Sequence, residues 1–94
     1  MRKVTVEIYT GPSCTPCVRA KSLLSKKLAG RGDIRLIEFD ISAHPERCPE
    51  MIERSRGRKT VPQIFIDGIH VGGFDDLETC ERSGRLDVML GICK

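Results

Sequence analysis

Apolar and polar residues alternate along the first part of the chain and then change to a helical spacing. The alternation from Lys3 to Tyr9 predicts a β-strand, because successive side chains of a strand point to opposite faces. From Thr15 to about Ala29 apolar residues recur every three or four positions, which predicts an amphipathic helix. A second strand is predicted from Ile34 to Phe39. This order, with short linkers, is typical of a βαβ unit with two parallel strands.

Two prolines complicate the next predicted helix, which is expected within residues 42–56. Proline in the interior of a helix is costly, because it removes a backbone donor and its ring clashes with the preceding turn. A start at Pro49, with Cys48 as the capping residue, is therefore favoured over a start near Pro45.

A hairpin and two helices are predicted for the rest of the chain. Strands are expected over residues 61–66 and 69–71, because Asp67-Gly68 between them is a strong signal for a two-residue turn. A helix is expected from about Asp75 to Gly84, followed by a short helix over residues 86–90. The alternation of strands and helices predicts an α/β fold.

The length and composition limit the class of protein. The chain has 94 residues, of which 39% are apolar and 31% are charged, so residues 1–94 are expected to form one globular domain. No apolar run is long enough to span a membrane. No targeting segment is predicted, because Glu7 follows closely on Met1-Arg2-Lys3. We therefore expect a cytoplasmic location, where a disulfide is catalytic rather than structural.

Charge gives a weaker indication about partners. The net charge is +3, but acidic residues are mixed with the basic ones, aromatic residues are few, and no nucleic-acid-binding signature is present. The basic cluster from Arg54 to Lys59 is compatible with a small anionic ligand. A monomer that binds neither nucleic acid nor membrane is expected.

Candidate chemistry begins with Cys14-Thr15-Pro16-Cys17, at the start of the first predicted helix. Thr15 and Pro16 are typical of helix starts, and the free N–H groups there favour a thiolate at Cys14. One helical turn brings Cys17 close enough to form a disulfide with Cys14. The context of a strand, the two cysteines and a helix favours a redox pair, with Cys14 as nucleophile and Cys17 as resolving thiol.

Metal sites are the main alternatives for these cysteines, together with a purely structural disulfide. Half of a zinc site is disfavoured because zinc needs four ordered ligands, and His44 and His70 have no matching partners. Covalent haem attachment needs a histidine after the second cysteine, where Val18 stands. We therefore predict no metal ligands in this chain.

Two later segments are candidate ligand-binding loops. In Thr60-Val61-Pro62, the missing N–H of proline leaves the Val61 backbone free to pair with an extended peptide, although a plain strand-start proline is an equal alternative. In Gly72-Gly73-Phe74-Asp75-Asp76, the helix-start N–H groups can hold a carboxylate. The two aspartates either cap their own helix or hold an ammonium group. A ligand with adjacent carboxylate and ammonium groups would use both features.

The ordered set of these motifs resembles the glutaredoxin family, and most closely the small bacterial dithiol glutaredoxins. The matching segments span essentially the whole chain and are residues 6–10, Cys14 with Cys17, residues 19–21, residues 60–67 and residues 72–77. The resemblance implies a thioredoxin-like fold with a four-stranded mixed sheet flanked by helices. It also implies a cis bond between Val61 and Pro62 and glutathione as co-substrate.

The resemblance further implies a role for each part of the site. Cys14 forms the mixed disulfide and Cys17 resolves it, while the Val61 backbone pairs with the cysteine of glutathione. Gly11 stands where the family often has lysine, so Lys59 and Arg58 are the expected partners of the glycyl carboxylate. The full set of expected glutathione-binding residues is Thr15, Lys59, Thr60, Val61, Pro62, Gly73, Phe74, Asp75 and Asp76.

Three functions remain open on the sequence. The favoured one is glutathione-dependent reduction of protein disulfides and of glutathione mixed disulfides. A [2Fe–2S] carrier, held by Cys14 of two subunits and two glutathiones, is disfavoured because Pro16 stiffens the loop, and a thioredoxin-type reductase is disfavoured by the Gly72–Asp76 loop. Cys48, Cys80 and Cys93 have no assigned role; Cys80 is expected to be a buried structural thiol, and Cys93 to be prone to oxidation near the terminus.

Overall fold

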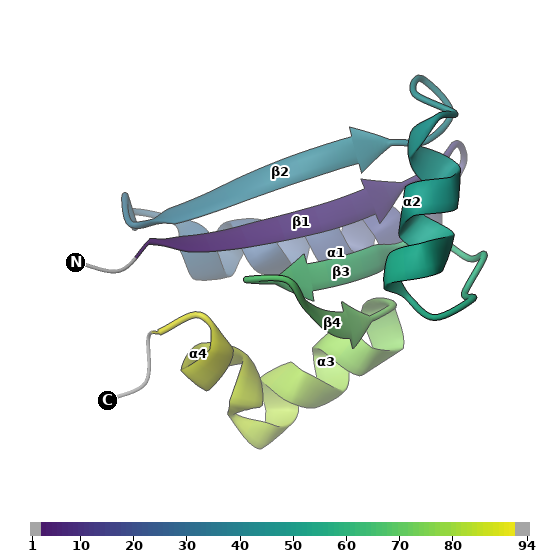
Figure 1. The fold of residues 1–94 in the computed structure, drawn as a ribbon. Coiled ribbons are helices and arrows are strands. Elements are labelled where there is room, and N and C mark those ends of the chain that lie inside the picture. Colours follow the sequence, from purple (N-terminus) through teal and green to yellow (C-terminus); the bar gives the residue numbers. More distant parts are fainter. Residues whose placement is uncertain (1–2, 92–94) are drawn as a thin grey trace.

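A computed structural model, which describes residues 3–91, contains a four-stranded mixed sheet with the strand order β2-β1-β3-β4. The strands are β1 (Val4–Thr10), β2 (Ile34–Asp40), β3 (Gln63–Ile66) and β4 (Ile69–Gly72). β1 pairs in parallel with β2, whereas β3 runs antiparallel to both β1 and β4 (Figure 1). The α/β thioredoxin-like fold with a mixed sheet is confirmed.

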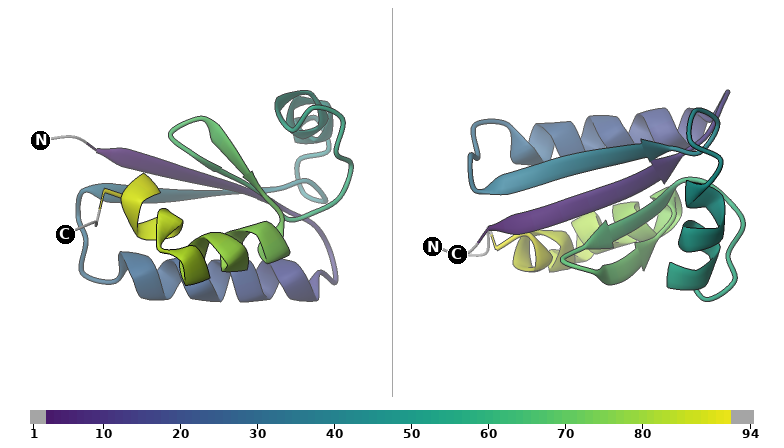
Figure 2. Two further views of the ribbon diagram at one scale, coloured as in Figure 1. Left: turned by 90° about the horizontal axis from the view of Figure 1, so that it is seen from below. Right: turned by 45° about the horizontal axis from the view of Figure 1, so that its top comes forward.

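Helices cover both faces of this sheet, in unequal amounts. The helices α1 (Thr15–Leu28), α3 (Phe74–Ser83) and α4 (Arg85–Met89) lie on one face, and α2 (Arg47–Arg54) lies against the other (Figure 2). The predicted βαβ unit is β1-α1-β2. No helix among residues 3–91 is both long and apolar enough to cross a lipid bilayer.

The larger core lies between the sheet and the three helices α1, α3 and α4. Alternate residues of β1 point into it, because side chains of a strand alternate between the two faces. Its buried apolar members are Val4, Val6, Ile8, Ala20, Leu24, Ile34, Ile64, Ile66, Leu77, Leu86 and Leu90. The predicted amphipathic faces therefore account for the packing on this side.

A smaller core lies between the sheet and α2. Its buried members are Tyr9, Met51 and Phe65, with partly buried apolar neighbours around them. Cys48 is one of these neighbours, whereas Cys80 packs against the larger core; both thiols are free and only partly buried. Cys80 is thus less buried than expected, and Cys93 lies outside the described residues.

Several predicted boundaries need correction. The helix expected to begin at Pro49 begins at Arg47, so the assignment of Cys48 as its capping residue is wrong. Pro49 is tolerated because it falls in the first turn, where a backbone N–H has no helical partner. The strand expected from Val61 begins at Gln63, since Pro62 has no N–H to donate to a neighbouring strand.

The turn between β3 and β4 follows the sequence prediction. Asp67 and Gly68 have φ angles of 51° and 81°, the conformation that a two-residue turn of type I′ needs. The turn returns the chain along β3, so that β4 leads directly to the start of α3. The two predicted ligand-binding loops therefore lie at the same end of the sheet as the start of α1 (Figure 1).

Candidate active site

The two cysteines of the predicted redox pair lie at the start of α1. Cys14 is the residue before the first helical turn, and its sulfur accepts a hydrogen bond from the backbone N–H of Cys17 at 3.1 Å. The two Cα atoms are 5.2 Å apart and the sulfurs are joined in a disulfide. Cys17 is buried, with 2% of its surface exposed, whereas Cys14 is half-buried. A reagent from solution can therefore reach Cys14 but not Cys17.

The Thr60-Val61-Pro62 segment lies beside this disulfide. The sulfur of Cys14 is 3.7 Å from the carbonyl oxygen of Val61, although the two residues are far apart in sequence. The bond between Val61 and Pro62 is cis, as the resemblance implies. Within residues 3–91 the N–H of Val61 has no hydrogen-bond acceptor. A backbone donor thus remains free next to the sulfur.

The start of α3 forms the third side of the site. Gly72 has a φ of 122°, and a Cβ atom there would overlap the carboxylate of Asp76, so this position requires glycine. The carboxylate of Asp76 accepts a hydrogen bond from the N–H of Gly73 at 3.0 Å and so caps the helix. The next N–H groups, of Phe74 and Asp75, have no carbonyl of their own helix to bind and are available to an anion.

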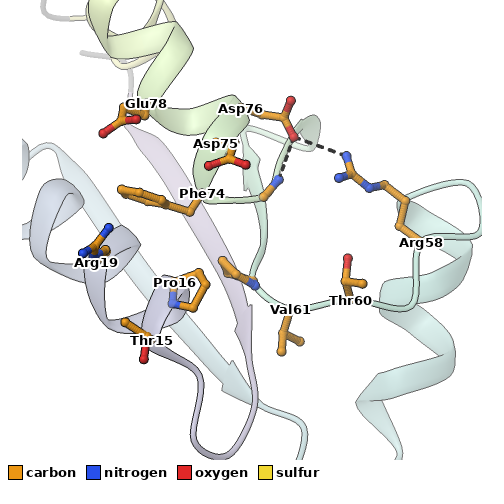
Figure 3. A pocket seen from close by; sticks show the side chains of 12 residues that line it. Thr15, Pro16, Arg19, Arg58, Thr60, Val61, Phe74, Asp75, Asp76 and Glu78 are labelled. Atoms are coloured by element: carbon orange, nitrogen blue, oxygen red, sulfur yellow. Dashed lines mark hydrogen bonds and ion pairs between the residues drawn. The ribbon is translucent and has the colours of Figure 1, made fainter.

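These three segments enclose a cavity of about 560 Å³ (Figure 3). Eight of the nine predicted glutathione-binding residues line it, namely Thr15, Thr60, Val61, Pro62, Gly73, Phe74, Asp75 and Asp76. The exception is Lys59, which is exposed and does not line the cavity, whereas its neighbour Arg58 does. The three segments that the resemblance assigned to one glutathione site therefore line a single cavity.

Two charged residues of the cavity were missed by the sequence analysis. Arg19 on α1 and Glu78 on α3 line the cavity together with Pro16 and Asp75. Each lies three residues after one of these two, and residues at that spacing share one face of a helix. Both residues could have been predicted from the sequence by counting one helical turn onward from Pro16 and from Asp75.

Asp75 and Asp76 differ in their environments. The carboxylate of Asp76 binds the guanidinium group of Arg58 at 3.3 Å in addition to its capping bond (Figure 3). The carboxylate of Asp75 has no partner among the described residues. From the sequence, each aspartate could either cap the helix or bind a ligand. In the structure only Asp76 caps the helix.

A family model named Glutaredoxin matches residues 6–71. The chain is 48% identical over 85 residues to glutaredoxin 3 of Escherichia coli K12, an alignment that covers 90% of this chain and 95% of the relative. It is 46% identical over 86 residues to glutaredoxin 1 of Rickettsia typhi, covering 92% of this chain and 79% of that protein. The chain belongs to the glutaredoxin family.

A solved glutaredoxin extends the comparison to structure. The buckwheat glutaredoxin–glutathione complex is 27% identical, with a TM-score of 0.73, over 92% of this chain and 76% of that one. Glutaredoxins reduce disulfides with electrons from glutathione. The activity of this chain is accordingly that of a glutathione-dependent disulfide oxidoreductase, and Cys14 with Cys17 is its dithiol pair.

Gly11 stands where the resemblance leads us to expect lysine. A Cβ atom at this position would lie 3.0 Å from Cγ2 of Val61, so any larger residue requires the Val61 side chain to shift. The loop after α2 contributes a basic residue to the cavity lining, Arg58. Among residues 3–91 no group of three or more histidine, cysteine or acidic side chains could hold a metal ion.

Proposed function

We propose that this glutaredoxin reduces protein disulfides and glutathione mixed disulfides through Cys14, with glutathione as co-substrate bound in the cavity between α1, the Thr60-Val61-Pro62 segment and α3. The observation that carries the proposal is the accessible sulfur of Cys14, which lies 3.7 Å from the carbonyl oxygen of Val61, a residue that lines the cavity. The buried position of Cys17 supports its role as the resolving thiol.

Each end of glutathione has a partner of suitable chemistry in the cavity. The free N–H groups of Phe74 and Asp75 suit the γ-glutamyl carboxylate, because a helix start favours negative charge. The unpaired carboxylate of Asp75 suits the adjacent ammonium group. The backbone of Val61 pairs with the cysteine of glutathione, and Arg58, which lines the cavity, can pair with the glycyl carboxylate. Thr15, Thr60, Pro62 and Gly73 complete the walls.

The reaction follows from thiol–disulfide exchange. The thiolate of Cys14 attacks a substrate disulfide, forms a mixed disulfide and releases the other sulfur as a thiolate. With a protein disulfide, Cys17 then displaces the second substrate thiol and leaves the disulfide between Cys14 and Cys17. Two glutathione molecules reduce this disulfide in turn, and together become glutathione disulfide. With a glutathione mixed disulfide, one further glutathione attacks the sulfur of the bound glutathione and frees Cys14.

Single substitutions separate these two routes. Cys14→Ser should abolish both activities, whereas Cys17→Ser should lose reduction of protein disulfides and keep deglutathionylation, because only the first route needs an internal resolving thiol. The assays are reduction of a protein disulfide and of a small glutathione mixed disulfide, each with glutathione and glutathione reductase. Cys80→Ser is the matched control, since that thiol lies outside the cavity. Activity of Cys14→Ser in either assay would contradict the proposal.

We also propose that the protein acts as a monomer in the cytoplasm. The cytoplasmic location is supported by the expectation that a reactive cysteine pair cycles between its dithiol and disulfide forms in a reducing compartment. Size-exclusion chromatography with light scattering, after anaerobic purification, tests the oligomeric state. A coloured dimer with the absorption of a [2Fe–2S] cluster would instead favour the carrier function.

A further inference from the structure

A buried glutamine connects the ligand cavity to the second face of the sheet. Gln63 has no exposed surface, and its side-chain NH2 donates to the carbonyl oxygen of Thr60 at 3.0 Å and to the hydroxyl of Thr60 at 3.2 Å. Its side-chain oxygen lies 2.7 Å from Nε2 of His70. Both polar atoms of this side chain are therefore used, and the nitrogen makes two hydrogen bonds to a residue that lines the cavity.

These contacts settle where the proton of His70 lies. The carbonyl oxygen of Thr60 only accepts hydrogen bonds, so the amide nitrogen of Gln63 must face it. The amide oxygen of Gln63 then faces His70, and Nε2 must carry the hydrogen that it receives. Burial, and then the positive charge of Arg58, lower the pKa of His70. The ring, stacked 4.9 Å from Phe65, therefore acts as a neutral, fixed donor to Gln63 near neutral pH.

Anchoring the Thr60 carbonyl also orients the N–H of Val61. The two groups belong to one peptide unit, which is trans, because the cis bond of this segment is the following one. In a planar trans peptide the C=O and N–H point in opposite directions. With the Thr60 oxygen held by Gln63, the N–H of Val61 points away from Gln63, and no described residue accepts it.

We propose that Gln63 and His70 are positioning residues that hold the Thr60–Val61 peptide group so that the Val61 N–H faces a ligand backbone in the cavity. This inference rests on the proposed binding of glutathione. Neither side chain lines the cavity, so both act through Thr60.

Matched variants test the role of the glutamine. Gln63→Leu keeps the approximate size and removes all three contacts, whereas Gln63→Glu keeps an acceptor toward His70 but places an oxygen against the Thr60 carbonyl. Both should raise the KM for a small glutathione mixed disulfide by about three- to ten-fold, the range expected for losing a neutral hydrogen-bond anchor. The rate of Cys14 alkylation by iodoacetamide, which needs no peptide pairing, should change less than about two-fold if this anchor is the only loss.

Histidine variants provide a milder test, because His70 is only partly buried. His70→Gln can still donate to Gln63 and should stay close to the wild-type KM, while His70→Leu should raise it. His44→Leu is the matched control, since His44 is exposed and outside the cavity. An equal effect of His70→Leu and His44→Leu, or an unchanged KM in a folded Gln63→Leu variant, would overturn the inference.

Nuclear magnetic resonance without glutathione separates this inference from the proposed function. The Val61 amide resonance should move in Gln63→Glu and Gln63→Leu but not in His44→Leu, whatever the enzyme uses as reductant. A Val61 resonance that stays in place in both Gln63 variants would overturn the positioning role. A wild-type enzyme that does not saturate with the glutathione mixed disulfide would instead contradict the proposed function.

Discussion

The two faces of the sheet are closed by different kinds of interaction. Against α1, α3 and α4 the sheet packs through a core of buried aliphatic side chains, with Leu24 and Leu77 among those with no exposed surface. Against α2, aromatic rings are surrounded by charges. The guanidinium group of Arg54 donates to both carboxylate oxygens of Glu7, at 3.1 and 2.8 Å, and lies 4.2 Å from the centre of the Phe65 ring.

The polar face forms a connected network. Arg54 also donates to the hydroxyl of Tyr9 at 2.8 Å, and that hydroxyl donates to the carboxylate of Glu50. Burial, more than any neighbour, raises the pKa of Tyr9, and the hydrogen bond from Tyr9 lowers that of Glu50. Farther along the chain, the hydroxyl of Ser55 donates to the carbonyl oxygen of Arg58 at 3.1 Å. A separate pair of hydrogen bonds from Ser55 thus holds the beginning of the loop that leads to Thr60.

The difference between the two faces indicates that they position different parts of the molecule. Apolar burial is strong but non-directional, so the first face fixes where α1 and α3 lie and brings their N-termini together. Hydrogen bonds depend on angle, so the second face fixes the orientation of a loop that has no regular secondary structure. The cavity forms where elements positioned in these two ways meet. Substitutions on the two faces should therefore have different consequences.

The largest loss of stability is expected on the apolar face. Leu24→Ala should lower the free energy of unfolding by about 2–5 kcal/mol, because it removes a fully buried side chain and leaves a cavity. Urea unfolding measures this loss. The KM for glutathione in the fraction that remains folded should be unchanged, since Leu24 does not reach the site. A loss below about 1 kcal/mol would show that the core collapses around the deletion.

A smaller loss with a different signature is expected on the polar face. Arg54→Leu should cost about 1–3 kcal/mol, because it leaves Glu7 and the Tyr9 hydroxyl without their donor. Adding Glu7→Gln should recover part of the loss, and the double-mutant cycle gives the coupling between the two residues. Simple additivity of the two substitutions would mean that the ion pair contributes no net interaction.

Much of the first face was predictable from the sequence. The alternation over residues 3–9 and the spacing over residues 15–29 identify β1 and α1, because hydrophobic periodicity reports directly which side is buried. The dithiol pair and most of the cavity lining were also predictable. Each of these lies in a short contiguous motif next to a helix start, and the ordered motifs match one family.

The second face could not be predicted in the same way. Glu7 and Arg54 are 47 positions apart in sequence, and a charged residue in a strand or helix is normally assigned to solvent. The sequence placed Arg54 in a basic cluster suited to an anionic ligand, whereas its guanidinium faces Glu7. The neighbouring sequence also does not indicate whether Arg58 or Lys59 lines the cavity. Which of these two residues lines the cavity depends on the path of the loop after α2.

The pH dependence of stability offers a further way to sharpen the comparison. Burial lowers the pKa of His70 in the folded protein below its usual value of 6.5. The unfolded chain therefore binds a proton more readily, and stability should fall as the pH drops through about 6.5 toward the lower folded pKa. His70→Gln should lose this part of the pH dependence, and His44→Gln should keep it. Urea unfolding from pH 5 to 8 makes the measurement, and an unchanged profile in His70→Gln would assign the dependence to other groups.

The smallest effect is expected at the ion pair that joins the two regions, since Arg58 follows α2 and binds Asp76 at the start of α3. Both side chains are about half exposed, at 46% and 48%, and pairs of this kind contribute only about 0.2–1 kcal/mol. A pair of the same kind between Arg58 and the glycyl carboxylate would contribute a similar amount, so Arg58→Ala should raise the KM for glutathione by about two- to five-fold, more at low salt than at high salt.

Lys59→Ala is the matched control for this ion pair, because it removes the same charge from the neighbouring position outside the cavity. Its effect on the KM for glutathione should be smaller than that of Arg58→Ala at every salt concentration. A larger effect of Lys59→Ala would mean that the glycyl carboxylate lies beyond the cavity edge, on the side of the loop that the sequence alone favoured. In that case Arg58 would only tie the loop to α3, and the salt dependence of its variant would be seen in stability rather than in KM.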